Sequence, residues 1–215
     1  QEWLSRLTLP SNCGLVEESW LKKKRSYDLV RNKIEQLIER HFLTRARNLL
    51  PFLPEAEVPY YEHFIKLLFN PETLLNTSQL YSDSSRFYRL VIKQWAKKDS
   101  ISAQKGLDYL QEKKMLSEPH FIELRNQLAI FQAGRSDAVE PLKRILAIPS
   151  AERTDEVLQW GFRLAAQQKE YLTALELLNA LSEEAKAEDT WSYWLGRMHE
   201  LNHKPLEAQQ FYKAI

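Results

Sequence analysis

Cysteine, glycine and long apolar runs are scarce in this chain of 215 residues. The one cysteine, Cys13, has no second cysteine with which to form an intrachain disulfide, and its apolar context predicts a small core residue. Five glycines and nine prolines are few for an all-β protein, which needs many turns. No segment approaches the run of about 18 apolar residues that spans a bilayer. We therefore expect neither a disulfide scaffold, nor an all-β fold, nor a membrane span.

A dominant charge and the common catalytic motifs are also missing. The chain has 30 Lys and Arg residues against 29 Asp and Glu residues, a formal net charge of +1. Such a balance gives no support for general nucleic-acid or anionic-membrane binding. The sequence contains no glycine-rich phosphate loop, no GxSxG elbow and no CxxC pair. We therefore predict no cofactor, no metal, no nucleic-acid partner and no catalytic residue in this chain.

What the sequence does contain is helical patterning. Hydrophobic residues make up 44% of the chain and charged residues 27%, as in ordinary globular proteins. Apolar residues recur every three or four positions, which indicates amphipathic helices. The fold class is predicted to be all-α, with helices expected over residues 16–21, 27–38, 42–51, 58–68, 87–98, 100–115 and 117–131, and a short helix or turn over 74–80.

A repeat near the end of the chain defines the architecture. Residues Trp160, Ala174, Leu178 and Leu181 recur at a constant offset as Trp194, Ala208, Tyr212 and Ile215. This offset matches the period of about 34 residues that is typical of a two-helix repeat. Such a repeat buries its apolar face against its neighbours. The sequence therefore predicts an α-superhelix, or solenoid, of helical hairpins.

The repeat covers only the second half of the chain. A slightly longer offset relates a third hairpin to the others, with Leu128, Ala129, Ala138, Leu142 and Ile145 matching Leu164, Ala165, Ala174, Leu178 and Leu181. The alanines of this register are expected where the two helices of a hairpin cross closely. We predict an irregular helical array over residues 1–116 and tetratricopeptide-like hairpins over 117–215, continuous with it.

One string resembles a zinc site. The segment His199-Glu200-Leu201-Asn202-His203 matches HExxH, in which two histidines on one helix face bind zinc and the glutamate acts as a base. The repeat register instead predicts a turn over 202–204, with Pro205 opening the next helix, so that His203 leaves the helix of His199. Position 209, where an extended motif would have a third histidine, is Gln209. We therefore interpret the string as a turn.

Three other features have both a functional and a structural interpretation. Glu17-Glu18-Ser19 contains carboxylates beside a hydroxyl, but adjacent acids in sequence are more typical of the first turn of a helix. The run Lys22-Lys23-Lys24-Arg25 beside Trp20 offers a polyanion contact, and is more typical of a solvated helix end. The six tryptophans and eighteen other aromatic residues could form platforms for sugars or bases, but are more typical of packing between helices.

The closing segment carries a resemblance to a known family. Residues 188–197, EDTWSYWLGR, followed by Pro205-Leu206-Glu207-Ala208 and Tyr212, resemble the last helix pairs of the superhelical domain in soluble lytic murein transglycosylases. Upstream, the order and approximate spacing of five further elements are similar to that family: Leu9-Pro10, Cys13, Trp20, residues 121–125 (FIELR) and Arg163-Leu164-Ala165. The similarity spans the chain, thinly over residues 26–116.

The resemblance implies a function for the parent protein rather than for this chain alone. In that family a helical ring or U accompanies a separate lysozyme-like domain, which cleaves the MurNAc–GlcNAc bond of peptidoglycan to a 1,6-anhydro product. Its catalytic glutamate lies in an E-S-x-F context followed by G-L-M-Q, whereas Glu18-Ser19-Trp20-Leu21 lacks both the phenylalanine and the second motif. The resemblance thus implies a noncatalytic, periplasmic superhelix, inactive alone, which positions peptidoglycan glycan strands or docks other cell-wall enzymes.

A second class of protein shares the same helical pattern. A helical-repeat adaptor with no enzymatic activity would use its concave face to capture a peptide or a partner helix. We expect the reading frame after Ile215 to separate the two hypotheses. A lysozyme-like segment with a glutamate–serine motif and G-L-M-Q would identify a transglycosylase, and a stop codon or further repeats would leave the adaptor.

Overall fold

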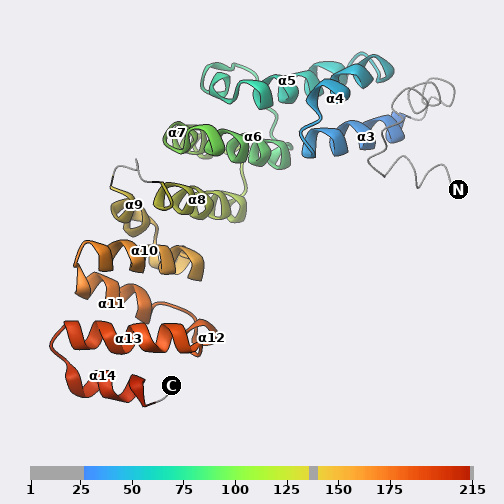
Figure 1. Ribbon diagram of the computed structural model, residues 1–215. Helices are drawn as coiled ribbons and strands as arrows, with labels where there is room; N and C mark the ends of the chain where they lie inside the picture. The colour runs from blue at the N-terminus through green and yellow to red at the C-terminus, as the bar shows by residue number, and fades with distance from the viewer. Residues whose placement is uncertain (1–26, 136–139, 214–215) are drawn as a thin grey trace, which may run out of the picture. The chain divides into compact units, whose positions relative to one another are not determined.

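The structure is helical throughout the parts of the chain that it describes. It is a computed structural model and describes residues 27–135 and 140–213 (Figure 1). These ranges contain helices, turns and loops but no strand, in agreement with the predicted fold class. None of the helices within them combines the length and the apolar character needed to cross a membrane.

The chain divides into two compact units, Gln1–Ser117 and Glu118–Ile215. The helices of the first unit are α3 (Tyr27–Glu39), α4 (Leu43–Leu49), η1 (Leu50–Phe52), α5 (Val58–Phe69), η2 (Pro71–Asn76), α6 (Ser85–Lys98) and α7 (Ser100–Glu112). Those of the second unit are α8 (Glu118–Ala133), α9 (Pro141–Ala147), η3 (Ser150–Glu152), α10 (Asp155–Gln167), α11 (Tyr171–Asn179), α12 (Glu183–Lys186), α13 (Asp189–Leu201) and α14 (Pro205–Tyr212).

The helices predicted within the described residues are confirmed, and the helix predicted over 16–21 lies outside those residues. Two side chains differ from what their local sequence leads one to expect. Ser84 precedes α6, where a serine is expected to cap the helix, but its hydroxyl donates to Tyr60 Oη at 2.9 Å and accepts no helix amide, because it faces the rings of α5. Phe131 has helical spacing with Leu124 and Leu128, which predicts a place on the buried face of α8, yet it is 42% exposed. The interior face of α8 near its end is formed by small or polar residues, Ala129, Gln132 and Ala133.

Aromatic rings form the centre of the first unit. Phe64 on α5 lies 4.9 Å from Phe87 and 5.0 Å from Tyr88 on α6, measured between ring centroids. Tyr60 packs edge-on against Tyr81 at 5.0 Å, which fixes the loop before α6 to α5. Such ring pairs contribute about 0.5–1.5 kcal/mol each beyond the area that they bury. These aromatic side chains therefore stabilise helix packing, as the sequence predicted.

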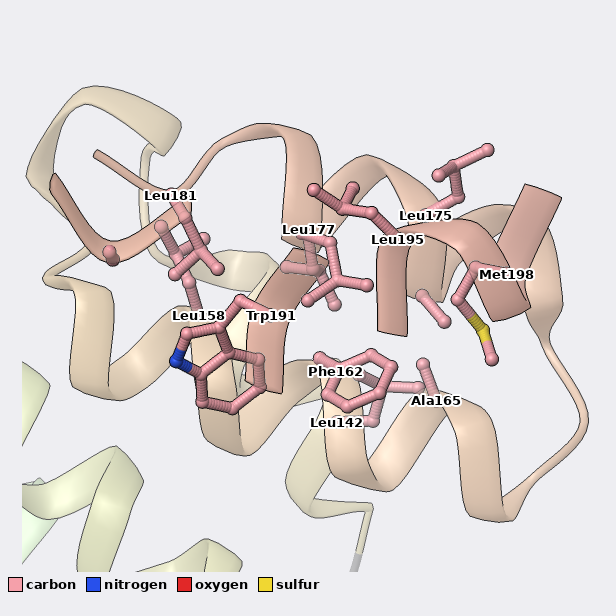
Figure 2. Close-up of a cluster of buried hydrophobic side chains, with 13 residues drawn as sticks. Leu142, Leu158, Phe162, Ala165, Leu175, Leu177, Leu181, Trp191, Leu195 and Met198 are labelled. Carbon is pink, nitrogen blue, oxygen red and sulfur yellow. The ribbon is translucent and has the colours of Figure 1, made fainter. Parts of the chain in front are cut away.

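Hairpins packed one on the next form the core of the second unit. Phe162 on α10 meets Trp191 on α13 edge-on, with ring centroids 5.9 Å apart, and Figure 2 shows both rings in one cluster. The cluster takes buried side chains from α9 through α13 (Figure 2). Ala174 and Ala208 are 0% and 2% exposed, as the repeat register requires, whereas Ala138 and Ile215 of that register lie outside the described residues. The core is thus shared between hairpins and belongs to none of them alone.

One backbone motif ends four of the helices. In each case a residue with positive φ follows the helix, and the next amide donates to the carbonyl five residues earlier, as in a Schellman motif. The four residues are His41, Lys114, Lys169 and His203, with φ of 60°, 57°, 62° and 61°. The following amides, of Phe42, Met115, Glu170 and Lys204, donate at 2.8, 2.9, 2.9 and 2.9 Å. The turns of hairpins α10–α11 and α13–α14 are therefore the same motif in successive repeats.

The left-handed position predicts a stabilising substitution. Lys169→Gly is expected to raise the free energy of unfolding by about 1 kcal/mol, because glycine has no Cβ to strain a backbone with positive φ. Urea unfolding followed by circular dichroism measures the change. Gln168→Gly is the matched control, since Gln168 has φ −81° and glycine there loses only conformational entropy. A Lys169→Gly chain no more stable than the control would contradict this account of the turn.

A second prediction concerns close packing between α6 and α7. A Cβ atom on residue 106 would lie 2.5 Å from Cζ3 of Trp95, and Trp95 is only 4% exposed. Gly106→Ala is therefore expected to destabilise the chain by about 1–3 kcal/mol, since the indole has to move within a packed core. Thermal and urea unfolding give the value.

Gly134→Ala is the control for this prediction. Its added Cβ would meet no atom closer than 3.7 Å, so the free energy of unfolding should change by less than about 0.5 kcal/mol. Equal stability of the two variants would show that helix α7 does not approach Trp95 as closely as described.

Candidate functional site

The HExxH string is divided between a helix and a turn. Helix α13 ends at Leu201 and α14 begins at Pro205, so His203 lies between them with φ 61°. Its amide donates to the carbonyl of Glu200 at 3.0 Å as part of the turn. The predicted turn over 202–204 is confirmed. The two histidines therefore do not share a helix face, which is the geometry that zinc binding through this motif requires.

The remaining residues of the string have structural partners. The ring of His199 stacks on Phe211 of α14, with centroids 5.2 Å apart and planes 15° from parallel. Its Nδ1 is buried without a hydrogen-bond partner, and burial lowers the pKa of His199, with a further contribution from the positive charge of Lys204. Glu200 accepts from Arg197 at 2.5 Å and from Tyr212 Oη at 3.1 Å, and the Arg197 hydrogen bond lowers its pKa. A carboxylate held in this way is a poor general base.

Carboxylates elsewhere in the described residues are also held by ion pairs. Glu57 accepts two hydrogen bonds from Arg31, at 2.6 Å each, and these hydrogen bonds lower its pKa. Glu35 accepts from Tyr61 Oη at 3.1 Å and from Arg86 at 3.0 Å. A general acid for glycosidic cleavage needs a carboxyl group with a raised pKa. The pKa values of Glu57 and Glu200 are instead lowered.

Several candidates from the sequence lie outside the described residues. They are Glu17-Glu18-Ser19, the basic run over 22–25 with Trp20, and Cys13. Among the residues that the structure does describe, no three or more His, Cys, Asp or Glu side chains gather so that they could hold a metal ion.

The first helix of each hairpin in the second unit (α8, α10 and α13) carries an arginine three or four residues after an aromatic residue. On α8, Arg125 lies over the ring of Phe121 at 4.9 Å and forms an ion pair with Glu152. On α13, Arg197 follows Trp194 by three residues and forms its ion pair with Glu200. In both hairpins a glutamate neutralises the guanidinium group.

The arginine of the middle hairpin differs. Arg163 on α10 is exposed, and its guanidinium carbon lies 5.4 Å from the ring centroids of both Trp160 and Trp191. None of the ion pairs between described residues involves Arg163. Two indole faces therefore hold this cation in place. No acidic side chain among the described residues neutralises its charge.

This arrangement was not predicted from the sequence, although a signal is present there. Trp160-x-x-Arg163 and Trp194-x-x-Arg197 have the same spacing and lie one repeat apart. The apolar positions alone define the repeat, and they assign no role to the arginine that recurs with them. The third partner, Trp191, comes from the next hairpin and could not be assigned to Arg163 from sequence spacing.

The comparisons with known proteins identify solved structures that have a similar fold. No protein-family model matches the chain, and no curated protein is significantly similar to it in sequence. Two solved structures are similar: the 70 kDa soluble lytic transglycosylase SLT70 from Escherichia coli, and the complex of the 70 kDa soluble lytic transglycosylase with bulgecin A. Each has a TM-score of 0.72 and 21% sequence identity to this chain.

The likeness covers nearly all of this chain and a minor part of the enzyme. It extends over 94% of the chain but only 33% of the transglycosylase chain. The predicted fold class, an all-α superhelix of helical hairpins like that of soluble lytic transglycosylases, is thereby confirmed. The tetratricopeptide-like character of the second half stays a prediction.

The environment of His199 predicts a pH dependence of stability. Its pKa is lowered from 6.5 in the folded chain, so the unfolded chain binds more protons as the pH falls through 6.5. Stability should therefore decrease between about pH 7 and pH 5. Burial lowers the pKa of His41 and His63 as well, so these residues contribute to the same decrease.

Comparison with His199→Phe isolates the contribution of His199. Phenylalanine keeps an aromatic ring against Phe211 and does not titrate, so the variant should lose less stability than the original chain over the same pH range. Urea unfolding at several pH values measures both. Identical losses would show that His199 is not buried in the neutral form.

Proposed function

We propose that this chain is the noncatalytic helical part of a lytic transglycosylase-related protein of the periplasm. In this proposal the parent protein cleaves the MurNAc–GlcNAc bond of peptidoglycan to a 1,6-anhydro product. The helical part positions glycan strands, or docks other cell-wall enzymes, and has no activity alone.

The structural likeness to SLT70 is the observation that carries the proposal. The likeness has a TM-score of 0.72 and extends over 94% of the chain, so the fold of nearly the whole chain is similar to part of a transglycosylase. The resemblance of residues 188–197 to the end of that family's superhelical domain supports the same conclusion independently. Because a fold supports more than one function, the substrate has to be tested directly.

The lowered pKa values of two carboxylates support a noncatalytic role. Glu57 and Glu200 each accept hydrogen bonds from an arginine that lower their pKa. Glycosidic cleavage by a carboxylic acid needs a proton on the acid near neutral pH, which a lowered pKa prevents. Neither of these two carboxylates is therefore suited to act as the general acid.

Co-sedimentation with purified peptidoglycan sacculi tests the proposal. The complete chain should sediment with sacculi but not with chitin, an uncharged β-1,4-linked glycan without peptides. The supernatant should contain no soluble 1,6-anhydro muropeptides, which chromatography with mass spectrometry would detect. A chain that remains in solution with sacculi, or one that releases muropeptides, would contradict the proposal.

One observation favours the alternative, a helical-repeat adaptor for protein partners. Leu172 on α11 and Leu206 on α14 are 67% and 77% exposed, and they occupy equivalent positions in successive repeats. Exposed apolar side chains repeated along a solenoid suit a protein interface. Under this alternative the chain would not sediment with sacculi. Under the main proposal, changing both leucines to serine should leave sedimentation unaltered.

A further inference from the structure

Three of the six arginines of the second unit can be compared with one another. Each is on the first helix of a hairpin, and two of them, Arg125 and Arg197, form ion pairs with Glu152 and Glu200. Arg163 has no such partner among the described residues, and two indole rings contact it instead. The guanidinium group of Arg163 is therefore available to a ligand.

The surroundings of Arg163 suit an anion that carries hydrogen-bonding groups. Guanidinium has five N–H donors, and its contacts with the two ring faces use no hydrogen-bond acceptor, so these donors are available to a ligand. The residues four before and four after Arg163 on the same helix face are Gln159 and Gln167, which are neutral amides. An acid at either position would compete for the guanidinium group, whereas an amide can bind the hydroxyl or amide groups of a ligand.

We propose that Arg163, held between Trp160 and Trp191, binds a carboxylate of the peptide-bearing glycan strand of peptidoglycan. This inference rests on the proposed function and assigns one of its contacts. The carboxylate accepts two N–H groups of the guanidinium in the bidentate geometry typical of arginine. Gln159 and Gln167 are placed to bind the polar groups on either side of it.

The low density of positive charge around Arg163 favours such a strand over nucleic acid as the ligand. Duplex DNA carries one phosphate per about 1.7 Å, and proteins bind it with several cations at once. Here one uncompensated arginine lies on a helix that begins with Asp155 and Glu156, and the adjacent α13 begins with Asp189. These acids would repel a dense polyanion. A polymer whose carboxylates are separated by sugar rings or by amides can place a single anion against Arg163.

Binding of soluble glycan–peptide fragments tests the inference. The complete chain is titrated with uncrosslinked fragments that have free peptide carboxylates, and with the same fragments after amidation. Calorimetry gives the affinity, and tryptophan fluorescence reports on the indoles beside Arg163. We expect the free acid to bind and to change the fluorescence, and the amidated fragment to bind more than about tenfold more weakly.

Substitutions at equivalent repeat positions separate Arg163 from general charge effects. Arg163→Gln should weaken binding of the free acid by more than about tenfold. Arg163→Lys should fall between Arg163→Gln and the unsubstituted chain, because lysine keeps the charge but lacks the planar fork. Arg197→Gln is the matched control, since it removes the same charge at the same register, and it should change binding by less than about twofold.

The outcomes distinguish the inference from the proposed function. If the chain binds the fragments but Arg163→Gln binds equally well, or the amidated fragment binds equally well, the inference is overturned and the function stands. If the unsubstituted chain binds neither fragment, the inference is overturned, and co-sedimentation with sacculi decides separately whether the proposed function stands. Circular dichroism of each variant establishes whether it is folded. If Arg163→Gln does not fold, Arg163→Lys still tests the inference.

Discussion

The structure depends on the fact that no helical hairpin of the second unit can bury its own apolar face. Phe162 of one hairpin is 3% exposed because Trp191 of the next hairpin covers it. Burying an aromatic side chain of this size contributes about 1.5–3 kcal/mol relative to leaving it exposed. The stability of each hairpin is therefore coupled to the presence of its neighbours, as expected for a repeat protein.

Close packing between neighbouring helices restricts which residues fit at their contacts. Gly161 lies where an added Cβ would meet Ile145 at 3.0 Å and Leu177 at 3.1 Å, so the side chains of two neighbouring helices occupy its space. The hairpin turns are constrained too, because the chain reverses through a left-handed residue at Lys169 and again at His203. The sequence that first suggested a metal site is in fact one of these turns.

The same stacking places residues of different hairpins beside each other on the outside of the unit. Arg163 lies over one indole of its own helix and one of the following hairpin, at 5.4 Å in each case. Arg197, at the same register in the next hairpin, and Arg125 on α8 are each neutralised by a glutamate. Arg163 differs from both because its charge is left available for recognition.

The amino-acid sequence by itself determined the helices, the repeat register and the family of folds, because apolar periodicity and turn residues act over a few positions of the chain. It also determined that His203 lies in a turn, since Pro205 opens the next helix. Only the tertiary structure decided that Ser84 binds Tyr60 instead of capping α6, that Phe131 is exposed, and that Trp191 meets Arg163. The reason is physical: these outcomes depend on side chains from separate helices, and contacts between helices are set by packing, which spacing along the chain does not encode.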